Sequence, residues 1–162
     1  MESLNRAALA LLCAVLSASH MAPAATSPST TAEEVARAEH LERNKRLVEG
    51  FFRDVFGAHD ADAAARYLRP DYIQHNPQVP GGLEGFQKFF RPQFAKISPE
   101  RRAASKLEVL HVVAEGDLVA IHLRYSGISA AGKRIEVTEF DLFRIEGDRI
   151  AEHWVAIPPA AE

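Results

Sequence analysis

Two short stretches of the sequence concentrate side chains that can move protons or bind a polar oxygen. The first contains Tyr72, Gln74, His75 and Asn76, directly before a proline-bearing loop. Loop residues on a rigid scaffold commonly bind ligands, and the pKa of a histidine, ordinarily ~6.5, suits proton exchange near neutrality. The stretch therefore predicts His75 as a proton carrier, with Tyr72, Gln74 and Asn76 binding a ligand. The alternative is that Asn76 and Pro77 only form a turn, while His75 donates to a backbone carbonyl.

The second stretch is the last predicted hairpin, which carries Asp141, His153 and Trp154. A tight turn centred on Gly147 and Asp148 places Asp141 opposite Trp154 in the ladder. In that register Asp141 and His153 point to different faces of the sheet. A direct contact between them then requires a bulge or a one-residue slip.

Structural roles remain open for these residues and for their neighbours. Asp141 is alternatively an ion-pair partner of Arg144 or Arg134, and His153 a surface residue. His122 alternates with the apolar positions of its strand and is expected to face solvent, whereas Tyr125 is expected in the core. The candidate acid–base residues are therefore His75, Asp141 and His153, with Trp154 added to the ligand-binding set.

Several common catalytic motifs are missing from the sequence. It contains no HExxH, no GxSxG, no phosphate-binding Walker loop and no GxGxxG. Metal-dependent, nucleotide-binding and serine-hydrolase chemistries therefore lose most of their support, and we expect no metal and no cofactor.

Helical patterns precede strand patterns along the chain. A long amphipathic helix is predicted over Glu33–Phe56 and is closed by Gly57, because apolar residues recur at three- and four-residue spacing. A short helix that begins at Asp60 or Asp62 follows and runs to Leu68. A third helix spans Leu83–Ile97, with Pro92 expected to kink or break it.

Everything after the helices has the pattern of strands. We predict strands at 107–114, 118–126, 134–145 and 150–157, after a short one at Tyr72. Three N-terminal helices followed by such a meander predict an α+β domain, in which a curved antiparallel sheet encloses a central pocket. Alternate strand residues would line that pocket.

The first residues have the features of a secretory signal peptide. An apolar run from Ala7 to Leu16 is followed by Ala22-Pro23-Ala24, an A-x-A cleavage pattern. We expect a signal peptide at 1–24, a flexible linker at 25–32, one domain at 33–158 and a tail at 159–162. The mature protein would be periplasmic or secreted and would lack Cys13, the single cysteine.

The charge of the chain limits its partners. The formal net charge is −3 at pH 7, which gives no electrostatic attraction to nucleic acid or to an anionic membrane. We therefore expect no nucleic acid partner, and no membrane association after signal cleavage.

The two chemistry-bearing stretches also resemble a known family. They are similar to two motifs of SnoaL-like polyketide cyclases, which belong to the nuclear transport factor 2-like superfamily. The first motif matches the Y-I-Q-H-N-P run at Tyr72–Pro77 together with the Gly82–Phe86 stretch. The second matches the D-L-F-R-I…H-W ending from Asp141 to Trp154. The resemblance spans Asn44 to Ile157. It implies the conical fold of that superfamily and a homodimer formed through the outer face of the sheet. It also implies cofactor-free acid–base work on a carbonyl compound by a carboxylate and a histidine.

One position departs from the family pattern. Relatives commonly have an aspartate after His-Trp, where this chain has Val155. Two functions therefore stay open. The first is an exported aldol-type cyclase, lyase or isomerase that acts on a small apolar carbonyl compound. The second is a periplasmic binding or interaction module that kept the pocket and lost the chemistry.

Overall fold

A computed structural model describes residues 31–156 of the chain. The expected signal peptide, most of the expected linker, the last two residues of the expected domain and the tail lie outside the described residues. Thr31 and Ala32 were expected in the linker. Thr31 is instead the N-cap of the first helix, where its side chain and that of Glu34 form a reciprocal capping box, and Ala32 is the first helical residue.

The long first helix has two parts. An α-helix, α1 (Ala32–Phe51), continues without interruption into a π-helical segment, η1 (Phe52–Gly57), which ends at the predicted Gly57. Such segments widen the turn by one residue and frequently occur at functional sites. Here the change of pitch lies where Phe51, Phe52 and Val55 enter the core.

The remaining helices are short. A 3₁₀ segment, η2 (Asp62–Arg66), takes the place of the short helix, and α2 (Gly82–Ala95) that of the third. The expected break at Pro92 is absent, since α2 runs through it and ends only one turn later. A further helix, α3 (Pro99–Ala104), has Ser98 as its N-cap. No helix of residues 31–156 is both long and apolar enough to cross a membrane.

Five strands form one mixed sheet of order β1-β5-β4-β3-β2. They are β1 (Leu68–Gln74), β2 (Lys106–Glu115), β3 (Leu118–Ile128), β4 (Arg134–Glu146) and β5 (Arg149–Val155). The last four form an antiparallel meander, and β1 adds to β5 in parallel at one edge.

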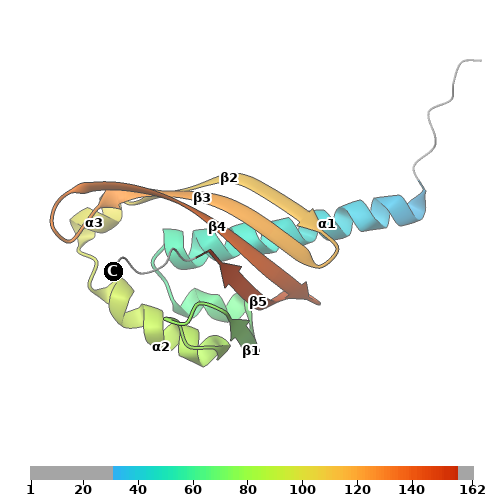
Figure 1. The fold of residues 1–162 in the computed structure, drawn as a ribbon, viewed down its shortest axis with the longest axis horizontal. Coiled ribbons are helices and arrows are strands. Elements are labelled where there is room, and N and C mark those ends of the chain that lie inside the picture. The colour runs from blue at the N-terminus through green and yellow to red at the C-terminus, as the bar shows by residue number, and fades with distance from the viewer. Residues whose placement is uncertain (1–30, 157–162) are drawn as a thin grey trace, which may run out of the picture. The chain divides into compact units, whose positions relative to one another are not determined.

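The helices cover one face of the curved sheet. Figure 1 shows the long strands β2 and β3 arching past α1, with α2 beside β1 and α3 near the end of β3, in agreement with the contacts between these elements. The core fills the space between. It contains Ile121 and Leu123 of β3, Phe143 of β4 and Phe86 of α2, all at most 2% exposed. The predicted α+β fold of helices over a curved sheet is thereby confirmed.

The predicted register of the last hairpin is wrong beyond its turn. Near the turn Ile145 pairs with Ile150, as expected, but Arg144 pairs with Glu152, so Ala151 has no partner in β4. This bulge shifts the rest of β5 by one residue and places His153 opposite Phe143. Because Phe143 and Asp141 share a face of β4, His153 and Asp141 lie on the same side of the sheet.

Candidate functional site

A cavity of about 250 Å³ opens between the inner face of the sheet and the helices. Aromatic side chains form most of its wall. The polar groups converge from β1, the loop after β1, β3, β4 and β5. They are Tyr72, Gln74, Asn76, Tyr125, Glu139, Asp141 and His153. A mostly apolar pocket with a few convergent polar groups is the usual form of a small-molecule site.

Asp141 is buried, with a side chain 2% exposed. Its Oδ1 lies 2.7 Å from Nε2 of His153. Its Oδ2 is buried and has no hydrogen-bond partner among the residues that the structure describes. A buried polar atom without a partner is costly, so Oδ2 is the oxygen left for a ligand.

A chain of hydrogen bonds behind His153 fixes its protonation pattern. Oε1 of Gln74 accepts from the backbone N–H of Asn76 at 2.9 Å, and Nε2 of Gln74 donates to the Tyr72 hydroxyl at 3.0 Å. The backbone donor settles which end of the amide is the oxygen. Nδ1 of His153 lies 3.0 Å from that same Oε1, so Nδ1 carries a hydrogen.

The contact between His153 and Asp141 must then contain a second hydrogen. A bare Nε2 lone pair facing a carboxylate oxygen would be repelled, whereas a shared proton gives a short, charge-assisted hydrogen bond. The pair is therefore imidazolium with carboxylate, or imidazole with carboxylic acid, and can move one proton. Phe143, stacked on the His153 ring with centroids 4.6 Å apart, holds the ring in place.

The hydrogen-bonded Gln74 side chain leads to a testable stability effect. Gln74→Leu removes the acceptor for two donors, on Asn76 and His153, in a partly buried site. We expect a loss of about 1–3 kcal/mol in the free energy of unfolding, measured by urea denaturation at neutral pH.

Gln74→Glu is the matched control for that change. A carboxylate still accepts from Asn76 N–H and from His153 Nδ1–H, so most of the stability should be retained. If Gln74→Leu is as stable as the wild type, the hydrogen-bonded chain does not form in solution.

Glu139 is a second carboxylate on the same face of β4, two residues before Asp141. Burial, and then the negative charge of Asp141, raise the pKa of Glu139 from 4.5 to about 7. Tyr125 also lines the cavity, and burial together with both carboxylates raises the pKa of its hydroxyl. Near neutral pH the cavity therefore holds a proton donor beside a proton acceptor, the arrangement expected of an acid–base pair.

Glu139 was not among the predicted site residues, although its position in the strand pattern indicates an inward side chain. The apolar alternation of Ile135, Val137 and Phe143 places residue 139 on the inward face of its strand. An acidic residue at an inward position is unusual and worth selecting for that reason.

His75 and Trp154 lie outside the cavity. The two rings stack on each other with centroids 4.9 Å apart, and Nε2 of His75 lies 2.7 Å from a carboxylate oxygen of Glu152, which also binds Arg144. Gln74 pairs with His153 in the sheet, so His75 and Trp154, one residue further in each strand, face the other way. The structure thus brings together five of the seven predicted site residues and separates these two.

The turn interpretation of Asn76 also holds. Its side-chain Oδ1 accepts from the backbone N–H of Gln78 at 2.9 Å, which forms a local turn. The same residue lines the cavity. On the outer face, His122 stacks on Phe140, and Nδ1 of His122 lies 3.2 Å from Nδ1 of His111.

Val155 is the direct ladder partner of Asp141, and both line the cavity. The position where relatives commonly have a carboxylate is therefore adjacent to a position where this chain has one.

Within residues 31–156, no three histidine, cysteine, aspartate or glutamate side chains gather in a geometry suited to a metal ion.

A curved sheet, helices that cover one of its faces and a cavity between them place this chain among the nuclear transport factor 2-like proteins. The chain belongs to the SnoaL-like family, since the sequence profile described as the SnoaL-like domain matches residues 48–153, more than half of the chain. A search of curated proteins finds no match.

Solved structures agree with that assignment. TsrD from Streptomyces laurentii is 27% identical, with a TM-score of 0.59 over 71% of this chain and 87% of that one. A candidate polyketide cyclase from Acidithiobacillus ferrooxidans is 18% identical, with a TM-score of 0.58 over 70% and 87% of the two chains. An LEH-like epoxide hydrolase from M. tuberculosis is 16% identical, with a TM-score of 0.56 over 70% and 77%. The last two establish similarity of fold alone.

Proposed function

We propose that this protein is a cofactor-independent acid–base enzyme that acts on a small apolar carbonyl compound, as an aldol-type cyclase, lyase or isomerase. The observation that carries the proposal is the carboxylate of Asp141. One of its oxygens binds His153, the other is buried and has no partner among the described residues, and Asp141 lines the cavity. The aromatic wall suits an apolar substrate, and the polar cluster at Asp141 suits its carbonyl.

The geometry supports a simple proton path. Oδ2 of Asp141 takes a proton from the carbon next to the carbonyl, while His153 keeps its hydrogen bond to Oδ1 of Asp141. The resulting carbon nucleophile forms a bond to a second carbonyl carbon of the same molecule, and Glu139 protonates the oxygen of that carbonyl. At the end Asp141 carries a proton and Glu139 has lost one, so the substrate has neither gained nor lost an atom. The net reaction is therefore an isomerisation that closes a ring. Partly buried donors at Tyr125 and Gln74 stabilise the developing negative charge.

Turnover of ring-closing dicarbonyl compounds by the purified protein tests this proposal. Product formation that depends on Asp141 supports the enzyme. Ligand binding without turnover would instead favour the non-catalytic binding module, which Val155 at the position of a common family aspartate also favours.

Glu139 gives the proposal a pH dependence. Its carboxyl group loses a proton near 4.5 when unfolded and near 7 when folded, so the folded state binds more protons between these pH values. Stability therefore falls as pH rises across that window. Glu139→Gln cannot ionise and should be more stable than the wild type at pH 8 by about 1 kcal/mol, a value reduced for solvent screening of a partly exposed group. At pH 4 the two should match.

Thermal denaturation at both pH values measures this difference. The wild-type kcat/KM should also decline above about pH 7, as the acid form of Glu139 is lost. An equal stability difference at both pH values would show that Glu139 titrates normally.

We also propose that the protein is exported and that it forms a homodimer. The apolar run and A-x-A pattern near the N-terminus support export, which N-terminal sequencing of mature protein tests, because a start at Met1 contradicts it.

The outer face of the sheet carries a continuous cross-strand row of Val113, Ala120, Leu142 and Trp154. Val113 is 64% exposed, and sedimentation measures whether a second copy covers this row.

A further inference from the structure

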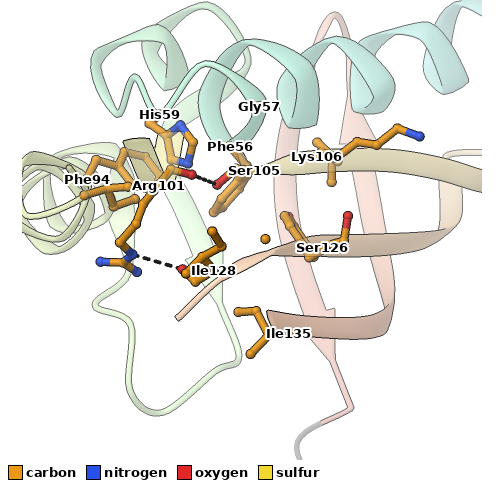
Figure 2. Close-up of a pocket in the computed structure, with 14 residues that line it drawn as sticks. Phe56, Gly57, His59, Phe94, Arg101, Ser105, Lys106, Ser126, Ile128 and Ile135 are labelled. Carbon is orange, nitrogen blue, oxygen red and sulfur yellow. Dashed lines mark hydrogen bonds between the residues drawn. The ribbon is translucent and has the colours of Figure 1, made fainter. Parts of the chain in front are cut away.

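A second cavity of about 210 Å³ adjoins the first. Figure 2 shows it between the end of α1–η1, the region around α3, and the open ends of β3 and β4. Phe56 and Tyr125 line both cavities. Only these two side chains are shared, so they form the partition between two neighbouring compartments.

The two compartments differ in the charged residue types that line them. The first contains Glu139 and Asp141, with no lysine or arginine among its lining residues in the described part of the chain. The second contains Arg101 and Lys106, with no aspartate or glutamate among the lining residues of that same part. Its other side chains are mostly apolar, including Phe94, Ile97, Leu107 and Ile135.

Arg101 is the cation of this second compartment that is available to a ligand. Its Nε donates to the backbone carbonyl of Ile128 at 3.0 Å, which holds the side chain across the cavity wall, as the dashed line in Figure 2 shows. Among residues 31–156 its guanidinium forms no ion pair. Lys106, by contrast, is already paired with Glu108 at 2.7 Å.

We propose that the second compartment binds a carboxylate at the far end of the substrate through Arg101. This inference rests on the proposed function and names its substrate class, an elongated keto acid. The carbonyl end lies beside Asp141, and the apolar chain passes Phe56 and Tyr125 to reach the guanidinium. A guanidinium matches a planar carboxylate with parallel hydrogen bonds. One unpaired cation in an apolar setting suits a monoanion better than a phosphate dianion.

The charge arrangement also orients the substrate. A carboxylate placed in the first compartment would lie beside the carboxyl groups of Asp141 and Glu139, with no lysine or arginine among the described lining residues to pair with it. The same group beside Arg101 gains an ion pair. Only one of the two orientations therefore presents the carbonyl to the acid–base residues.

The test uses methyl-ketone acids from oxopentanoate to oxoundecanoate and the methyl ester of each. Binding to the purified wild-type protein is measured by isothermal titration calorimetry. We expect at least one acid to bind about tenfold more tightly than its ester, because the ester loses the charge-assisted hydrogen bonds. Equal affinity for acid and ester across the series, or no binding of any acid, overturns the proposal.

Variants locate the effect at Arg101. Arg101→Gln should abolish the preference for the acid over its ester, whereas Arg101→Lys keeps the charge and should keep part of the preference. Lys106→Gln, at the same rim but already paired in the wild type, is the matched control and should keep all of it. A preference that survives Arg101→Gln overturns the assignment.

The same experiment separates this inference from the proposed function. A ring-closing diketo acid, added to the series, that binds through Arg101 but is not turned over supports the carboxylate site and contradicts the enzyme. Turnover of diketo acids and of their methyl esters with equal affinity supports the enzyme and contradicts the carboxylate site.

Discussion

Asp141→Asn is expected to lower kcat/KM by about 10²–10⁴-fold on any substrate that the wild-type protein converts. The amide has nearly the shape of the carboxylate, and its oxygen can still accept a hydrogen bond from His153. It cannot take a proton from carbon, so the proton path stops at its first step. Steady-state kinetics measure the loss, and thermal denaturation checks that the fold is kept.

Glu152→Gln is the matched control for that variant. Glu152 is also a carboxylate 2.7 Å from a histidine, but its partner is His75 and the pair lies on the outer face, away from the cavity. Activity should stay near the wild-type level. A similar loss in both variants would mean that the inner pair has no special role, and an active Asp141→Asn would remove Asp141 from the mechanism.

Phe143→Ala should cost about 3–5 kcal/mol in the free energy of unfolding. Phe143 is 1% exposed and packs against the rings of Phe51 and Phe52, with centroids 6.1 and 5.7 Å away. Removing it leaves a void in the core and takes the support from the His153 ring. Chemical denaturation measures the loss, and binding to the cavity should weaken as well.

Phe140→Ala is the same substitution on the opposite face of the same strand. Phe140 is 62% exposed, so its removal should cost less than about 1 kcal/mol in dilute solution, where the proposed dimer dissociates. Equal losses in the two variants would contradict the face assignment of β4.

Most of the fold could be predicted because its patterns are local. Val119, Ile121, Leu123 and Tyr125 alternate with smaller or polar residues, and this period of two placed one face of β3 in the core, as observed. The helix α3 was missed because it has only six residues, too few for a periodic pattern.

The site was harder to predict because it depends on register. No glycine or proline marks Ala151 as a bulge, so the sequence alone placed Asp141 and His153 on opposite faces. The alternation of side chains along β1 and the residues after it was informative, because it places Tyr72, Gln74 and Asn76 on one face of the sheet and His75 on the opposite face. Deciding which of these faces points into the cavity requires knowing that Gln74 pairs with His153. That pairing is a parallel contact between distant segments of the chain.

The bulge at Ala151 has a consequence for how relatives of this protein can differ in length. It divides the β4–β5 hairpin into a part whose register is set by the turn and a part whose register is set by the neighbouring strands. A relative that lacks one residue between Gly147 and Glu152 can form a regular ladder and still place its histidine opposite Phe143. Single-residue deletions at this point should therefore preserve the proton-sharing pair, although in an alignment they appear to displace it.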